Sequence, residues 1–119
     1  MAYVDGFLTP VPKTSLKNYR ALSRRMGKIW REYGALEFRE CVADDVSWGK
    51  RTSFPRAVKQ KASETVCFAY IVYKSRADRD RVNAKAMKDK RLAAWMDPRK
   101  LPFDAKRMIW GGFKPLVSL

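Results

Sequence analysis

Apolar and basic side chains recur every three or four residues between positions 14 and 34, which is the spacing of an amphipathic helix. The apolar positions are Leu16, Tyr19, Leu22, Met26, Ile29, Trp30 and Tyr33, and the basic positions are Lys17, Arg20, Arg24, Lys28 and Arg31. At about 100° per residue, the two sets point in nearly opposite directions. The pattern predicts a helix that begins after a cap at Thr14 or Ser15 and stops at Gly34.

Four shorter stretches are typical of strands, because they alternate or are rich in Val, Ile, Phe and Tyr. They cover residues 3–11, 36–46, 65–74 and 106–117. A second helix is predicted from Ser75 to about Lys88, since Ser75 followed by Asp78 resembles a capping box. Residues 91–96 predict a further helical turn, and residues 48–55 predict a loop.

The order of these elements is β-α-β-β-α-β. This order predicts an α+β fold of the ferredoxin-like type, with four antiparallel strands and two helices on one face of the sheet. A single domain over residues 1–119 is expected, because a second core would need roughly another 100 residues. The helices leave the other face of the sheet uncovered.

The third predicted strand is apolar on both of its faces, whereas a half-exposed strand should alternate with polar residues. One face carries Val66, Phe68, Tyr70 and Val72, and the other carries Cys67, Ala69, Ile71 and Tyr73. A twin subunit is the simplest cover for the second face. We therefore expect a homodimer in which two sheets pack face to face as a dimeric α/β barrel.

The chain carries 26 Lys and Arg against 12 Asp and Glu, which gives a formal net charge of +14. Such an excess favours polyanions such as RNA and DNA, but it also arises where basic side chains only face solvent. In the nucleic-acid alternative, the basic positions of the first helix are the expected contact, through weak and non-specific phosphate binding. The third strand lacks the glycines of an RNA-recognition motif, which argues against that domain.

Histidine is absent, and the two cysteines, Cys41 and Cys67, form no Cys-x-x-Cys unit. Histidine-dependent triads and four-ligand zinc sites are therefore excluded, and no glycine-rich phosphate loop is present. We expect no metal and no bound cofactor, so any general base must be Asp, Glu, Lys, Tyr or Cys. The N-terminus lacks secretory features and the longest apolar run has eight residues, so a cytoplasmic protein without a membrane partner is expected.

Two carboxylates are the candidate catalytic groups. Glu40 shares a strand face with apolar residues such as Phe38, and such surroundings raise the pKa of a carboxyl group, which suits acid–base catalysis. Its alternative role is an interface salt bridge with an Arg of the twin subunit. Asp5 is the second candidate, and its alternative role is a structural ion pair with Lys106 or Arg107 on the last strand.

Candidate ligand-binding residues come from loops and from the last two strands. They are Trp48, Phe54, Arg56, Tyr70, Asp104, Lys106 and Arg107. The loop aromatics near Arg56 line a pocket or reach the twin subunit, and Asp104 with its basic neighbours binds a carboxylate or closes a local salt bridge. Asp44 and Asp45 are interpreted as a turn, and Cys41 as a small buried thiol.

Several short segments form a distinctive series along nearly the whole chain. They are Tyr-Val-Asp-Gly-Phe at 3–7, Gly-Ala-Leu-Glu at 34–37, Glu-Cys-Val at 40–42, Glu-Thr-Val at 64–66, Pro-Phe-Asp at 102–104 and Gly-Gly-Phe at 111–113. In this order they resemble the YbaA-like family of short uncharacterised bacterial proteins, which falls in the dimeric α/β-barrel superfamily.

The resemblance implies a homodimer with one ligand pocket per subunit, between the sheet and the helices, and it implies no known reaction. Other members of the superfamily include cofactor-independent monooxygenases, but a shared fold does not transfer chemistry. The resulting hypothesis is a cytoplasmic homodimer that binds a small molecule, with cofactor-independent catalysis as its fuller form. Weak, non-specific binding of RNA or DNA is the alternative.

Overall fold

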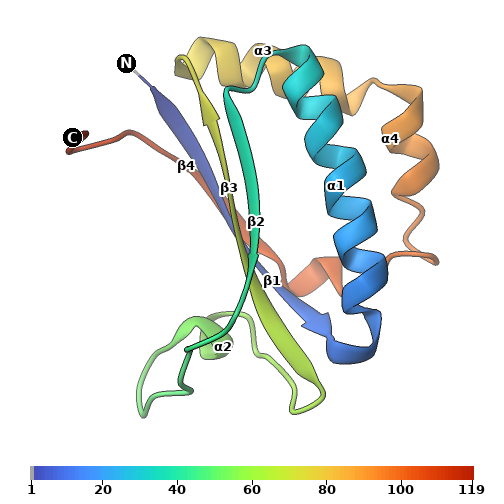
Figure 1. Cartoon of the computed structure of the whole chain (residues 1–119), viewed down its shortest axis with the longest axis vertical. Helices are drawn as coiled ribbons and strands as arrows, with labels where there is room; N and C mark the ends of the chain where they lie inside the picture. Colours follow the sequence, from blue (N-terminus) through green and yellow to red (C-terminus); the bar gives the residue numbers. More distant parts are fainter. Residues whose placement is uncertain (1) are drawn as a thin grey trace.

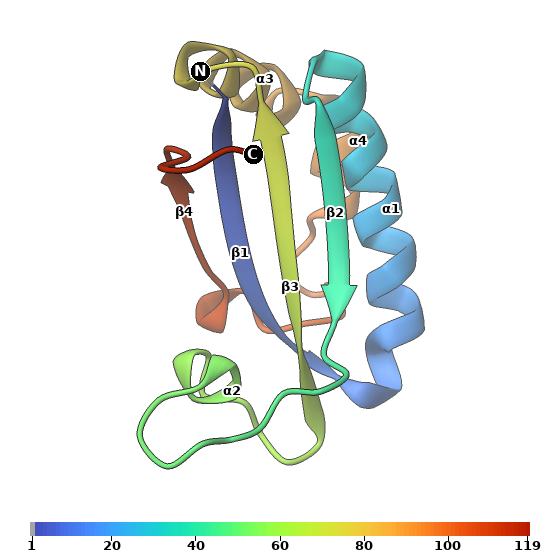
Figure 2. The ribbon, with the colours of Figure 1, turned by 60° about the vertical axis from the view of Figure 1, so that its left-hand side comes forward.

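The computed structural model describes residues 2–119 and centres on one four-stranded antiparallel sheet. Strands β1 (Tyr3–Pro12), β2 (Glu37–Val42), β3 (Glu64–Tyr73) and β4 (Ile109–Phe113) lie in the order β2-β3-β1-β4, which can be followed in Figure 2. Helices α1 (Leu16–Tyr33), α3 (Arg76–Met87) and α4 (Lys90–Trp95) lie on one side of the sheet (Figure 1). The predicted α+β ferredoxin-like fold is confirmed.

Three predicted elements differ from the structure in extent. The strand expected over 36–46 ends at Val42. The last strand is shorter than 106–117, because residues 105–107 form a 3-10 turn in which Asp104 accepts the backbone N–H of Lys106. The loop predicted at 48–55 contains the start of a short helix, α2 (Phe54–Ala57), whose first turn is capped by Ser53. Both caps satisfy backbone N–H groups that would otherwise lack partners.

The two long helices begin and end as predicted but pack differently. Gly34 ends α1 with a φ of 122°, a conformation that glycine adopts without strain, and Ser75 caps α3 by accepting the N–H of Asp78. Helix α1 buries six residues, whereas α3 buries only Val82 and Ala86. Within residues 2–119, none of the helices is long and apolar enough to cross a membrane.

Polar contacts complete the packing of α3. Asn83 accepts hydrogen bonds from the Trp30 indole at 2.9 Å and from the Tyr73 hydroxyl at 3.2 Å. Arg79 lies over the Tyr3 ring and approaches Asp5. A helix with so little buried apolar surface therefore depends on these contacts for its position.

Both faces of β3 are apolar, as predicted, and the structure shows that they differ in burial. Cys67, Ala69, Ile71 and Tyr73 are buried on the helix-covered side. The other face of the sheet exposes apolar side chains of β3 and β4, with exposed fractions of 45% for Phe68 and 62% for Phe113. Helix α2 borders this open face, where the Phe54 ring packs edge-on against Phe68.

Candidate functional site

A cavity of about 120 Å³ lies between α1 and the helix-covered face of the sheet. Its walls are mostly apolar: Phe7, Met26, Trp30, Phe38, Ile71, Met96, Phe103 and Met108 all line it. Helix α1 forms one wall of the cavity, because residues three or four positions apart, such as Ser23, Met26 and Trp30, lie on the same side of the helix. The polar groups on its walls include Thr9, Ser23 and Glu40.

Glu40 reaches this cavity from β2, where it lies opposite Ala69 of β3. The Ser23 hydroxyl donates a hydrogen bond of 2.8 Å to Oε1 of Glu40. Its other oxygen, Oε2, is buried and has no hydrogen-bond partner among residues 2–119. Burial raises the pKa of the Glu40 carboxyl, while hydrogen bonding by Ser23 and Tyr19 works in the opposite direction.

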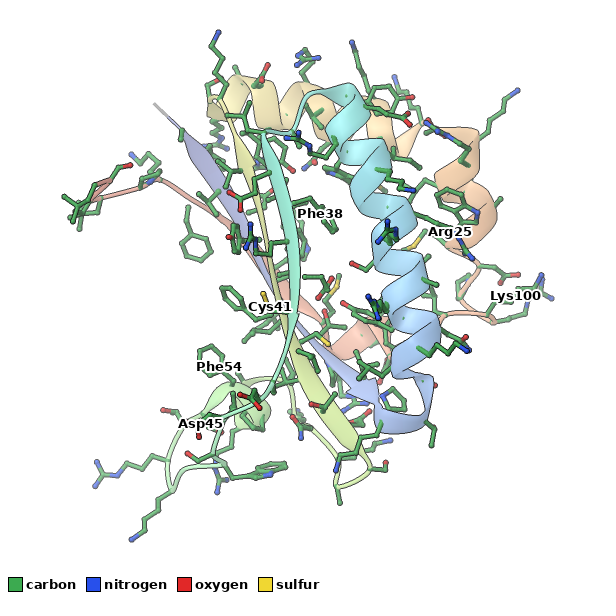
Figure 3. All side chains as sticks on the ribbon, viewed as in Figure 1. Arg25, Phe38, Cys41, Asp45, Phe54 and Lys100 are labelled. Atoms are coloured by element: carbon green, nitrogen blue, oxygen red, sulfur yellow. The ribbon has the colours of Figure 1, made fainter. Side chains whose placement is uncertain are left out.

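A second and larger hollow of about 1250 Å³ is an open groove between α1 and β2. It meets the cavity at four residues that line both: Tyr19, Ser23, Phe38 and Glu40. Phe38 lies between β2 and α1 (Figure 3), and its ring packs so closely on Gly27 that a Cβ there would come within 2.6 Å of it. The Phe38 ring therefore forms part of the boundary between the groove and the cavity.

The basic positions of α1 face this groove rather than open solvent alone. Four of the five border it, namely Arg20, Arg24, Lys28 and Arg31, whereas Lys17 does not line it. The buried face of α1 is wider than its apolar positions, because it also includes Ser23 and Gly27, which lie next to Arg20 around the helix.

Asp5 lies in a different environment from Glu40. It is 1% exposed, and its Oδ1 is 3.5 Å from Nε of Arg79 on α3. The predicted ion pair of Asp5 with Lys106 or Arg107 is wrong. Arg107 binds Glu64 instead, with Nη2 of Arg107 2.6 Å from Oε2 of Glu64. Burial raises the pKa of Asp5, and the Arg79 charge lowers it.

Over residues 2–105, the chain matches the family described as a protein of unknown function (DUF1428). The chain belongs to this family. It is 42% identical over 118 residues to the uncharacterized protein YbaA of Escherichia coli K12, and the alignment covers 99% of both chains. The resemblance to the YbaA-like family is confirmed.

Solved structures similar to this DUF1428 chain share its fold at low identity. SnoaB, a cofactor-independent oxygenase from Streptomyces nogalater, matches with a TM-score of 0.61 and 10% identity, over 99% of this chain and 96% of SnoaB. A dimeric ferredoxin-like protein from an uncultured marine organism matches with a TM-score of 0.56 and 14% identity, over 100% and 98% of the two chains. At such identities the likeness establishes the fold alone.

The charged residues before β4 do not line the cavity of this DUF1428 chain. Arg107 donates to Asp104 over 2.9 Å and to Glu64, so the local salt bridge expected for Asp104 is confirmed. Lys106 is exposed. The same segment instead contributes its apolar neighbours, Phe103 and Met108, to the cavity wall.

The remaining candidate ligand-binding residues lie on the loop before β3 or on the open face. Arg56 donates to the backbone carbonyl oxygens of Trp48 and Gly49, at 2.9 Å and 3.0 Å, and so holds the loop closed. Tyr70 donates to Glu37 over 3.1 Å. None of Trp48, Phe54, Arg56 and Tyr70 lines the cavity around Glu40.

Two further expectations are tested by burial. Cys41 is exposed, so its interpretation as a buried thiol is wrong: it follows Glu40 on the edge strand β2 and therefore faces the uncovered side. Asp44 and Asp45 form an exposed bend after β2, as predicted. Within residues 2–119, no group of three or more Cys, Asp or Glu residues is placed to hold a metal ion.

Ser23 is one of the residues of the candidate site that sequence reasoning missed. A signal for it exists, because Ser23 and Gly27 are small residues four positions apart on the buried side of a helix whose other buried residues include Tyr19 and Trp30. Small residues on such a face leave space beside it. Phe103 and Met108 carry no comparable signal, since their positions depend on the path of the chain after α4.

Proposed function

We propose that this protein binds a small molecule in the cavity between α1 and the sheet. On that ligand, Glu40 acts as a general acid or base without a metal or bound cofactor. The supporting observation is the buried Oε2 of Glu40, which has no hydrogen-bond partner among residues 2–119. An unsatisfied buried oxygen costs about 1–3 kcal/mol of stability, and a ligand that donates to it removes this cost.

The volume of the cavity limits the group that enters it. At about 120 Å³ it is slightly smaller than an engineered apolar cavity in another protein, of about 150 Å³, that binds benzene. A single ring or a short branched hydrocarbon fits this space, while a larger ligand must extend into the groove. The apolar walls supply the binding energy through burial, and the few polar groups fix orientation.

The chemistry that suits Glu40 is proton transfer. A ligand with an acidic O–H or C–H next to Oε2 gives its proton to the carboxylate, which leaves a neutral carboxyl group and the conjugate base of the ligand. Ser23 donates to Oε1, which leaves Oε2 without a partner among the described residues and able to accept from a ligand. The raised pKa of Glu40 brings its titration closer to neutral pH, where a general base is most effective.

The alternative role of Glu40, an ion pair with an Arg of a twin subunit, fits the geometry poorly. Glu40 points to the helix-covered side of the sheet, where it contacts Ser23 of α1. A second copy packed on the open face would lie on the other side of β2. The carboxylate therefore serves a ligand inside one subunit.

The test is an NMR titration of ¹⁵N-labelled protein with phenol, between about pH 5 and about pH 8, where phenol stays neutral. Glu40→Gln and Glu37→Gln form a matched pair, because both change a glutamate of β2 but only Glu40 faces the cavity. We expect saturable shifts at Phe38 and Ile71, with a pH dependence that only Glu40→Gln removes. Shifts confined to the open face, or no saturable binding, would contradict the proposal.

We also propose that a second copy of the chain covers the open face of the sheet. The supporting observations are the exposed apolar side chains there, including Phe68, Ile109 and Phe113, and a structural neighbour described as dimeric. Exposed patches of this kind on a sheet mark an interface. Two copies packed through this face would also shield the Phe54 ring of α2.

Light scattering on the eluting protein tests the dimer. We expect a species of twice the 13.8 kDa chain mass, and Phe68→Glu should shift it to the monomer. Trp110→Glu is the matched control, because Trp110 is an exposed aromatic residue of β4 that stacks on Phe7 and so lies on the helix side. A monomeric wild-type protein, or loss of the dimer only in the control, would rule out this interface.

A further inference from the structure

Three cations border the groove without an ion-pair partner. Arg20, Arg24 and Lys28 are exposed, and no acidic side chain of residues 2–119 lies within 4.0 Å of their charged groups. They follow each other at intervals of four residues along one line of α1, about 6 Å apart. Like charges at this spacing repel each other and weaken a helix, which an anion between them would reverse.

The other two groove cations have structural roles. Arg31 donates to the backbone carbonyl oxygens of Ala35 and Leu36, and so joins the end of α1 to the start of β2. Arg39 pairs with Glu37 at 3.0 Å. The charge left free for a ligand is therefore concentrated at the three unpaired cations.

The groove and the cavity adjoin at Glu40. Ser23 and Glu40 line both spaces. Ser23 lies beside the line of unpaired cations on α1, and it donates a hydrogen bond to Glu40 on β2. A ligand that enters the cavity from the groove passes these cations before its end reaches the apolar walls. The two spaces together thus offer one apolar end and one basic end.

We propose that the ligand of this site is an organic acid with a small apolar end. Its ring or short hydrocarbon group occupies the cavity beside Phe38, and its anionic group lies in the groove against Arg24 and Lys28. Because this inference rests on the proposed function, it names the class of molecule on which Glu40 acts.

A small acid fits these observations better than a nucleic acid does. The three unpaired cations span about 12 Å along α1, which matches one or two anionic groups rather than the many phosphates that a polynucleotide contact neutralises. They also lie beside a cavity that accepts an apolar group, and phosphate backbones offer none.

The test compares acids with neutral molecules of the same shape. Phenylacetate, 3-phenylpropionate and 4-phenylbutyrate are titrated into ¹⁵N-labelled protein beside their primary amides. We expect at least one acid to bind about tenfold more tightly than its amide, because charge-assisted hydrogen bonds to guanidinium groups are strong. Added salt should reduce this preference, since the groove is open to solvent.

A pair of double variants assigns the preference to the groove. Arg24→Gln with Lys28→Gln removes two groove cations, and Lys85→Gln with Lys88→Gln removes two exposed cations near the end of α3. The net charge changes equally in both. The first variant should lose the preference for the acid while keeping its affinity for the amide, and the second should bind both as the wild type does.

The outcomes separate this inference from the proposed function. Equal affinity for acids and amides, with shifts at Phe38 and Ile71, would overturn the inference and leave the small-molecule site in place. If no aromatic probe binds in the cavity, both are wrong. A short single-stranded oligonucleotide that binds far more tightly than every acid, and loses affinity in the groove variant, would assign the groove to nucleic acid and overturn the inference.

Discussion

Glu40 and Glu64 are two glutamates of the same sheet with opposite electrostatic environments. Glu64, which is 4% exposed, meets the guanidinium of Arg107 at 2.8 Å and 2.6 Å and accepts the backbone N–H of Lys61 at 2.7 Å. These contacts hold its pKa below the ordinary value. Glu40 accepts a hydrogen bond of 2.8 Å from the Ser23 hydroxyl and has no cation beside it within residues 2–119, and burial raises its pKa although the hydroxyls of Ser23 and Tyr19 lower it.

The difference separates a carboxylate that stabilises the fold, Glu64, from one that does not, Glu40. A buried carboxylate that accepts two hydrogen bonds from an arginine is satisfied within the chain. Removing the arginine leaves the carboxylate charge buried without a partner. A buried carboxylate with an unpartnered oxygen weakens the folded state, and the proposed ligand would remove that cost. Asp5 lies between these cases, with Arg79 at 3.5 Å and a raised pKa.

The largest effect is expected where the satisfied pair is broken. Arg107→Met leaves Glu64 buried without its cation, and we expect the free energy of unfolding to fall by about 3 kcal/mol. Urea unfolding measures it. The control is Arg99→Met, because Arg99 pairs with Asp97 on the surface with 88% of its side chain exposed, and its loss should change stability by less than about 0.5 kcal/mol. An equal loss of unfolding free energy in Arg107→Met and Arg99→Met would contradict the difference expected between a buried and an exposed ion pair.

A smaller effect of opposite sign is expected at Glu40. Glu40→Gln keeps the acceptor for Ser23 and removes a carboxylate that burial disfavours, so the protein should gain on the order of 1 kcal/mol at neutral pH. Thermal unfolding should move upward by a few degrees. A loss of stability would mean that the chain itself satisfies the Glu40 charge.

The pH dependence of stability should separate the two glutamates further. The folded pKa of Glu40 lies above the ordinary value of 4.5, so its unfavourable contribution is absent below 4.5, grows as the pH rises toward the folded pKa and is complete above it. The folded pKa of Glu64 lies below 4.5, so its favourable contribution is present above 4.5 and is lost as the pH falls through the folded pKa. Unfolding of Glu40→Gln and Glu64→Gln across this range should therefore give difference curves of opposite sign.

The smallest effect is expected on the other face of β2. Glu37→Gln changes a carboxylate that is 40% exposed and pairs with the exposed Arg39, so stability should stay within about 0.5 kcal/mol of the wild type. The Tyr70 hydroxyl can still donate to the Gln oxygen. A large change in the stability of Glu37→Gln would show that solvent exposure does not predict how much these carboxylates contribute to stability.

Periodicity in the sequence was sufficient for the fold and for one residue of the candidate site. The helix ending at Gly34, the cap at Ser75 and the two faces of β3 follow from local rules on spacing, capping and alternation. Glu40 was found because one polar residue shared a strand face with apolar ones. Such patterns lie within one short segment, so they can be recognised without knowing which residues are neighbours in space.

The ion pairs could not be predicted, because they join positions far apart in the chain. Arg79 reaches Asp5 only through the packing of α3 over β1, and Arg107 reaches Glu64 only because a 3-10 turn ends the strand expected there. The exposure of Cys41 likewise depends on β2 being an edge strand with an uncovered side. Pairings of this kind depend on tertiary packing, which a single sequence does not encode locally.

The weak apolar packing of α3 also bears on how rigid the molecule is. With only Val82 and Ala86 buried, α3 and the attached α4 should open locally at a lower free energy than α1, and their amide hydrogens should exchange with solvent sooner. Met96 directly follows α4 and forms part of the cavity wall. Each such opening would loosen that wall while α1 and the sheet hold Ser23 and Glu40 in place, so the cavity can expand on its α4 side without losing its polar end.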